Sequence, residues 1–123
     1  FTSVRDLIKG MRDAIKCHKS LFESAGILHR DVSPGNIMLS KYRSRNIESA
    51  SGIVSSEAPH GFLIDLDLAK YVGPIQATAD STPRSMRRWT GTMLFMAIEI
   101  LQGTCLRHSW RHDLESFFYV FIW

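Results

Sequence analysis

Three polar side chains have the types and spacing to do chemistry together. Asp31 follows a histidine and an arginine, Asn36 lies five residues further on, and Asp65 ends an apolar segment. A carboxylate close to a hydroxyl group can accept its proton, and amide and carboxylate oxygens are hard ligands that suit Mg²⁺. The pattern indicates a base and a metal site, as phosphoryl transfer requires. The alternative is a β-turn capped by asparagine, because residues 33–36, Ser-Pro-Gly-Asn, are also typical of a turn.

The composition predicts one globular domain. The chain has 123 residues, of which 45% are hydrophobic and 22% charged, and this suits a single domain with a core. A net charge of +3 does not by itself argue for a nucleic-acid partner. The longest fully apolar run, residues 117–123, is too short to span a membrane. Cys17 and Cys105 show no metal-ligand spacing and fit an intracellular location, cytoplasmic or nuclear.

A long amphipathic helix is predicted over residues 3–24. Apolar side chains recur there at steps of three and four residues, which is the period of one helix face. Ser3 and Asp6 form a capping box at the start, and Gly26 is a stop signal at the end. His18 lies on the apolar face, and we expect it to be a packed residue rather than a ligand. The charged face is expected to be solvated: Arg5, Lys9, Arg12, Asp13, Lys16 and Lys19.

Short strands are expected on both sides of the Asp31 motif, so that residues 27–39 form a loop on a rigid base. Residues 41–61 lack any hydrophobic period and are predicted to be a variable loop. Residues 62–64, Phe-Leu-Ile, are then predicted to be a buried strand that ends at Asp65.

Four motifs in the same order resemble those of the C-terminal lobe of the protein kinases, most closely the fungal-type protein kinase group. Residues 29–36 resemble the catalytic loop H-R-D-x-x-x-x-N, and residues 64–69 the strand and D-F-G segment. Residues 91–99 resemble the end of the activation segment, with A-I-E in place of A-P-E, and residues 112–117 the start of the buried central helix. The resemblance implies an α+β fold, a mainly helical lobe with short strands around the catalytic loop.

The resemblance also implies roles for individual residues. Asp31 would orient the substrate hydroxyl and accept its proton, while Asn36 and Asp65 would hold the Mg²⁺ ions that accompany ATP. His29 would be structural and pack beneath the loop. Arg30 would pair with a phosphorylated or acidic residue of the activation segment, residues 65–99.

Three further residues would support the site. Thr92 would lie in the substrate-facing loop and form a hydrogen bond near Asp31. Asp113, in the helix expected over residues 112–123, would hold the backbone of the catalytic loop. Glu99 would form a structural ion pair with an arginine beyond Trp123. Residues 78–90 contain several hydroxyl groups and arginines, and we hypothesise that phosphorylation there orders the activation segment.

Three positions depart from the kinase pattern. Ser33, assigned to the cofactor-binding loop, replaces a lysine that contacts the transferred phosphate, so its positive charge is missing. Asp67 replaces the glycine of D-F-G; it either assists metal binding or is a solvent-facing acid of a turn. Ile98 replaces a proline, and only a packing consequence is expected.

The resemblance implies an ATP-dependent serine/threonine-type protein kinase acting on a protein substrate. Small-alcohol phosphotransferases of the same fold are an alternative, because they also lack the lysine that Ser33 replaces. A non-catalytic, pseudokinase-like scaffold is another. Residues 90–92, Thr-Gly-Thr, favour the protein kinase. Neither a glycine-rich loop nor a V-A-I-K lysine can be assigned before the first residue, and both chain ends look cut. We therefore expect that the N-terminal lobe is missing and that the isolated chain is inactive.

Overall fold

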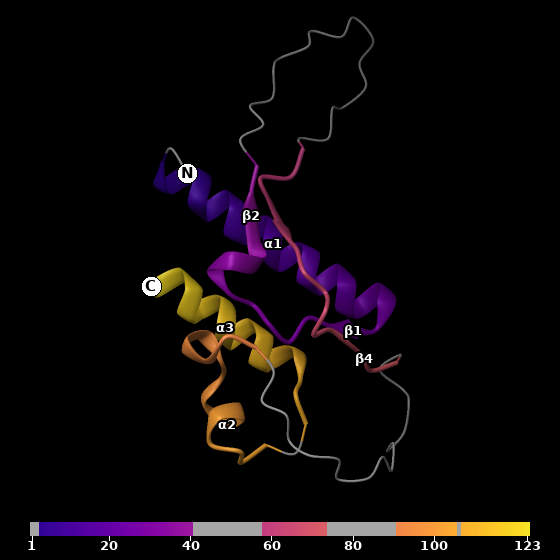
Figure 1. The fold of residues 1–123 in the computed structure, drawn as a ribbon. Helices are drawn as coiled ribbons and strands as arrows, with labels where there is room; N and C mark the ends of the chain where they lie inside the picture. The colour runs from indigo at the N-terminus through magenta and orange to yellow at the C-terminus, as the bar shows by residue number, and fades with distance from the viewer. Residues whose placement is uncertain (1–2, 41–57, 74–90, 106) are drawn as a thin grey trace, which may run out of the picture.

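The chain has an α+β fold, in which a long helix is followed by short strands that form antiparallel pairs and then by further helices (Figure 1). The computed structural model describes residues 3–40, 58–73, 91–105 and 107–123. In chain order, the elements are α1 (Val4–Ala25), β1 (Ile27–Leu28), η1 (Pro34–Asn36), β2 (Ile37–Leu39), β3 (Gly61–Leu63), β4 (Lys70–Tyr71), η2 (Met93–Phe95), α2 (Ile98–Leu101) and α3 (Trp110–Ile122). Strand β1 pairs with β4, and β2 pairs with β3. No helix within the described ranges is long and apolar enough to cross a membrane.

Helix α1 begins and ends within one residue of the predicted range, because local signals define both ends. The Ser3 hydroxyl accepts a hydrogen bond from the Asp6 backbone N–H at 3.2 Å, which satisfies one of the free donors of the first turn. At the other end, Gly26 adopts a left-handed conformation with a φ of 64°. Glycine reaches that conformation without steric cost.

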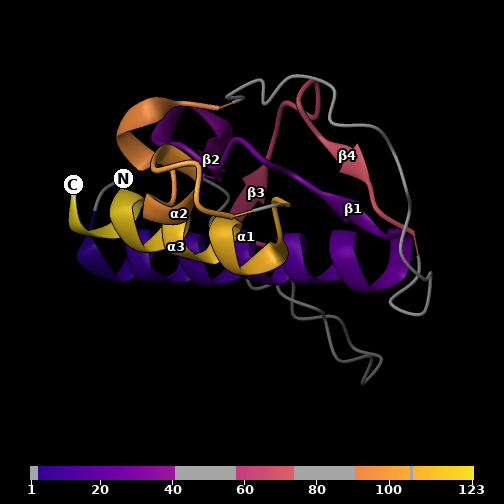
Figure 2. The same ribbon diagram turned by 90° about the horizontal axis from the view of Figure 1, so that it is seen from below.

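Helices α1 and α3 run side by side in opposite directions, and the core lies between them and the loop after β1 (Figures 1 and 2). Its buried members are Met11, Ala14, Val32 and Phe117. Helix α3 starts two residues before the predicted position, because Ser109 caps it and forms a capping box with His112.

The prediction that Asp13 lies on the solvated face of α1 is wrong. The Asp13 side chain is buried, and its carboxylate accepts hydrogen bonds at 2.8 Å from the His60 backbone N–H and from Arg12 Nε. Burial alone would raise the pKa of Asp13, but these hydrogen bonds outweigh it and lower the pKa. The acid therefore connects α1 to the residue that precedes β3.

The prediction that residues 62–64 form a buried strand is also wrong. Strand β3 spans Gly61–Leu63, and Phe62 and Ile64 are exposed. Successive side chains of a strand point to opposite faces, and α1 covers only the face that carries Gly61 and Leu63. Because β3 begins at Gly61, the loop predicted over residues 41–61 is at least one residue too long at its end. Residues 41–57 lie outside the described residues.

The backbones of α1 and β3 touch where two glycines face each other. A Cβ atom built on Gly61 would overlap the Gly10 carbonyl oxygen and would lie 2.7 Å from the Gly10 carbonyl carbon. Real Cβ atoms do not approach backbone this closely, so helix and strand would have to separate. This contact fixes how near the β2–β3 pair lies to α1.

We expect Gly61→Ala to lower the free energy of unfolding by about 1–3 kcal/mol, as overpacking does. Chemical denaturation would measure the loss. Gly35→Ala is the matched control, because the nearest atom to its added Cβ would be Ser33 Oγ at 3.8 Å. Equal stability of the two variants would show that the α1–β3 approach is not close in solution.

Candidate active site

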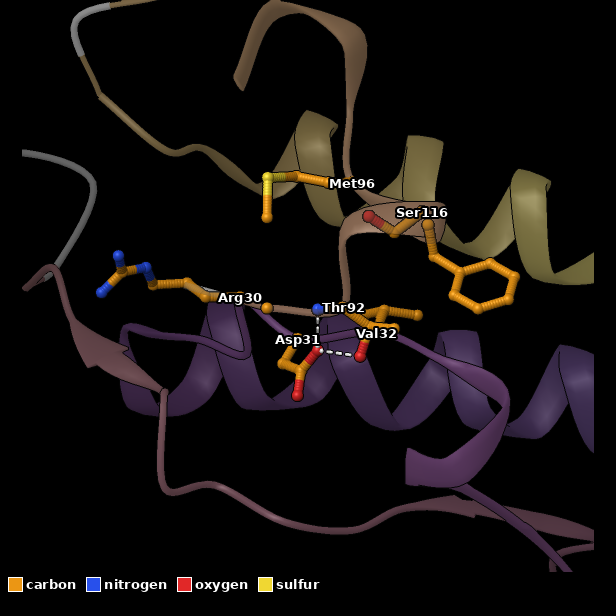
Figure 3. Close-up of a pocket in the computed structure, with 8 residues that line it drawn as sticks. Arg30, Asp31, Val32, Thr92, Met96 and Ser116 are labelled. Atoms are coloured by element: carbon orange, nitrogen blue, oxygen red, sulfur yellow. Dashed lines mark hydrogen bonds between the residues drawn. The ribbon is translucent and has the colours of Figure 1, made fainter. Parts of the chain in front are cut away.

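The carboxylate of Asp31 is held through both of its oxygens. Asn36 Nδ2 donates to Asp31 Oδ2 at 3.0 Å and to the Asp31 backbone carbonyl at 2.8 Å. The backbone N–H and the hydroxyl of Thr92 donate to Asp31 Oδ1 at 2.7 and 3.0 Å. Figure 3 shows Asp31 and Thr92 facing each other, whereas the Arg30 side chain extends away from them. Two segments 61 residues apart in sequence thus fix one partly exposed carboxylate.

A small cavity of about 10 Å³ lies beside this contact, which leaves room for one water molecule at most. A substrate would therefore reach Asp31 from its exposed side and not through this cavity. The lining residues are Arg30, Asp31, Val32, Gly91, Thr92, Phe95, Met96 and Ser116 (Figure 3).

Gly91 allows the Thr92 segment to approach the catalytic loop. Its φ is 119°, and a Cβ atom at this position would lie 2.8 Å from the Arg30 carbonyl oxygen and 3.4 Å from Asp31 Oδ1. Both the backbone conformation and the close approach require glycine. Sequence reasoning used Gly91 only as part of a motif and did not recognise this contact.

His29 connects the catalytic loop to the strand that leads to Asp65. The ring is fully buried, its Nδ1 accepts from the Asp31 backbone N–H at 3.3 Å, and its Nε2 lies 3.1 Å from the Ile64 carbonyl oxygen. Because Nδ1 accepts from an N–H group, Nε2 is the ring nitrogen that donates. The Ile64 N–H in turn donates to the Asn36 carbonyl at 3.0 Å. Both ring nitrogens are therefore used for structure.

Asn36 and Asp65 supply oxygen atoms suited to a magnesium ion. The hydrogen bonds described for the Asn36 side chain use its nitrogen, so the amide oxygen is the atom that could bind a cation. Asp65 is exposed, and its Oδ1 accepts from the Asp67 backbone N–H at 3.2 Å. The described residues hold no group of three or more His, Cys, Asp and Glu side chains that could bind a metal. An amide and a carboxylate fit Mg²⁺, which keeps waters and phosphate oxygens as its other ligands.

Ser33 and Asp67 differ in their surroundings. Ser33 is buried at the start of η1, and its carbonyl accepts from the Asn36 N–H at 3.0 Å. The side chain of Asp67 is exposed. Ser33 therefore belongs to the turn that positions Asn36. The sequence of residues 33–36 had also indicated a turn.

Asp113, in the first turn of α3, holds the backbone of the loop that contains Asp31. Its side chain is only 1% exposed and accepts from the backbone N–H groups of His29 and Arg30 at 3.1 and 3.2 Å. His18 Nε2 and His108 Nε2 lie 2.9 and 2.6 Å from its two oxygens. Four donors therefore match the four acceptor sites of an ionised carboxylate.

Burial alone would raise the pKa of Asp113, but the hydrogen bonds from His108 and His18 outweigh it and hold this pKa far below its usual range. The carboxylate also supports an unusual backbone. Arg30 has a φ of 70°, a conformation that costs about 1–2 kcal/mol for a residue other than glycine, and its N–H is one of the four donors.

His18 and His108 are the site residues that sequence reasoning missed. His18 was expected to be packed, and its burial confirms this, but its hydrogen bond to Asp113, 95 residues away, was not foreseen. One signal was available, because a buried polar side chain on the apolar stripe of a helix needs a hydrogen-bond partner. The partner itself could not be read from the local sequence.

Glu99 and Ile98 form contacts that sequence reasoning did not predict. His112 Nε2 lies 3.1 Å from the Glu99 carboxylate, and the ion pair of Glu99 with an arginine stays a prediction. The prediction that Ile98 has only a packing role is wrong, since its backbone N–H donates to Glu115 Oε1 at 3.0 Å. Proline has no such donor. The hydroxyl groups of the predicted phosphorylation segment, residues 78–90, lie outside the described residues.

Comparison with known proteins identifies the family. A family model described as "Fungal protein kinase" matches residues 1–123, and the chain therefore belongs to the fungal protein kinase family. The chain is also similar to serine/threonine-protein kinase PknD of Chlamydia felis (strain Fe/C-56). The two are 33% identical over 81 residues, which cover 66% of this chain and 8% of that protein. The chain thus corresponds to a small part of the length of PknD.

Proposed function

We propose that this chain forms the C-terminal lobe of an ATP-dependent protein kinase, which transfers the γ-phosphate of ATP to a serine or threonine hydroxyl of a protein substrate. The observation that carries the proposal is the Asp31 carboxylate, whose two oxygens are held by Asn36 and Thr92. Membership of the fungal protein kinase family supports it.

Asp31 orients the acceptor hydroxyl and accepts its proton. A general base must be fixed within hydrogen-bond reach of the proton that it removes. Thr92 and Asn36 fix the carboxylate on opposite sides, while Asp31 stays partly exposed to an incoming substrate. His29 does not act as the base, because both of its ring nitrogens are engaged.

Asn36 and Asp65 would hold Mg²⁺ together with the phosphates of ATP. When bound, Mg-ATP supplies the phosphoryl group, and the ion neutralises charge that develops during transfer. Ser33 lies in this nucleotide-side loop and brings no positive charge, so charge compensation rests more heavily on the metal ligands.

A protein acceptor is favoured over a small alcohol. Gly91 and Thr92 bring a second segment against Asp31, and this segment offers an exposed surface along which a polypeptide can lie. Leu94 is 79% exposed just after it.

Phosphate transfer by the protein in its full natural length tests the proposal. We expect radiolabel from the γ-position of ATP to appear as phosphoserine or phosphothreonine in a mixture of proteins, only with Mg²⁺ present. Asp65→Asn should reduce the labelling by at least about 100-fold, because a metal ligand is lost. Label in a small alcohol alone, or labelling by the Asp65→Asn variant at the unmodified rate, would overturn it.

A further inference from the structure

The second turn of α3 accepts a hydrogen bond from the first residue of α2. The Ile98 N–H is one of the groups that has no partner within a helix, and it donates to Glu115 Oε1 at 3.0 Å. The same oxygen accepts from the Tyr119 hydroxyl at 2.8 Å, which holds the Glu115 side chain in place. This hydrogen bond also raises the pKa of Tyr119.

A second contact lies one residue further along α2. The Ser109 backbone N–H donates to His112 Nδ1 at 2.9 Å, so this nitrogen carries no proton and Nε2 carries it. The Nε2–H then donates to Glu99 Oε2 at 3.1 Å. The cap of α3 therefore selects the histidine tautomer that binds α2.

A short segment of chain, tightened by local hydrogen bonds, connects Thr92 to α2. The Phe95 N–H donates to the Thr92 carbonyl at 3.0 Å, and the Met96 N–H donates to the Met93 carbonyl at 3.3 Å. Phe95, Met96 and Ala97 are buried, and Ala97 is the residue that precedes α2. A displacement of α2 would therefore move Thr92 relative to Asp31.

The first turn of α3 holds the other side of that contact, since Asp113 binds the backbone N–H groups of His29 and Arg30. We propose that Glu115 and His112 are positioning residues that place Thr92 against Asp31. The catalytic consequence rests on the proposed function, whereas the positioning itself does not.

Amide hydrogen exchange of the Thr92 N–H tests the positioning without any nucleotide. We expect Glu115→Ala to speed this exchange by about 10-fold, as the loss of one hydrogen bond to a charged group would do. The exchange of the Ala14 N–H in α1 should stay unchanged. Glu23→Ala is the matched control, because Glu23 is exposed and, among the described residues, its ion pair is with Lys19 at 3.8 Å. An equal rise at Thr92 and Ala14 would indicate a loss of global stability and would overturn the proposal.

A double substitution isolates the backbone donor. Ala97 has a ψ of 142°, which is compatible with a following proline, so Ile98→Pro removes the N–H without forcing the helix start. In the Ile98→Pro background, Glu115→Ala should leave Thr92 exchange unchanged. A further 10-fold rise would show that Glu115 does not act through the Ile98 N–H.

If Glu115→Ala does not fold, Glu99→Ala offers a second test, because Glu99 is 55% exposed. It should also speed Thr92 exchange, and no change would contradict the role of His112.

If exchange responds but no phosphotransfer is found, the positioning stands and the proposed function fails. If phosphotransfer is found and exchange does not respond, only the positioning fails.

Discussion

Asp31→Asn is expected to lower the rate of phosphotransfer by about 100- to 10,000-fold, the range attributed to a general base. The amide has the shape of the carboxylate and can still accept from Thr92, but it cannot take a proton from the acceptor hydroxyl. Asn36 keeps its 2.8 Å hydrogen bond to the Asp31 backbone carbonyl, so the loop retains one of its connections. The loss is therefore expected in kcat, with the KM for ATP changed by less than about threefold.

Steady-state kinetics of the protein in its full natural length would measure both constants, and thermal unfolding would verify that the variant is folded. Glu23→Gln removes a charge on the exposed part of α1 and serves as the control. If Asp31→Asn kept more than about one third of the kcat, proton transfer to this carboxylate could not contribute a general-base effect, and another role for Asp31 would be required.

Local signals in the sequence were sufficient for the long helix and its ends. The spacing of apolar residues marks the face of α1, and Ser3 and Gly26 mark its ends through interactions with residues at most five positions away. The order of the four kinase motifs was sufficient to select Asp31, Asn36 and Thr92 as one group. In both cases the information lies in short stretches of sequence.

Side chains with distant partners could not be placed in this way. Asp13 looked like one more charge on a solvated face, yet its partner His60 is 47 residues away. His18 and Asp113 are 95 residues apart. A hydrogen bond between such residues depends on how α1, β3 and α3 pack, and no local pattern specifies that.

The replacement of proline by Ile98 shows a different limit of prediction from the sequence. A proline-to-isoleucine replacement looks like a change of volume when side chains are compared. Its structural consequence lies in the backbone, because isoleucine has the N–H that proline lacks, and Glu115 accepts from it. A comparison of motifs identifies the altered residue, but it does not identify the side chain that accepts a hydrogen bond from the new N–H group.

Asp113→Asn is expected to lower the free energy of unfolding by about 3–5 kcal/mol, as the loss of one member of a buried charged network does. Whichever way the new amide is oriented, its NH₂ group faces donors, because His108 and His18 approach opposite oxygens. The Arg30 backbone also loses support for its φ of 70°. Denaturant unfolding would measure the change, and Asp67→Asn, which alters an exposed acid, should stay within about 0.5 kcal/mol of the unmodified protein.

The effect of Asp113→Asn on the free energy of unfolding is expected to depend on pH. The pKa of Asp113 is lower in the folded protein than in the unfolded chain, where an aspartate has a pKa of about 3.9. Its contribution to stability is therefore complete above about pH 4 and is lost as the pH falls further, by at most about 1.4 kcal/mol per pH unit. The difference in unfolding free energy between the unmodified protein and Asp113→Asn should narrow as the pH falls below about 4. If the asparagine variant does not fold, His108→Ala removes one of the four donors and should show the same narrowing with a smaller difference. A difference that stays constant down to about pH 3 would show that the carboxylate is not held in its charged form by these partners.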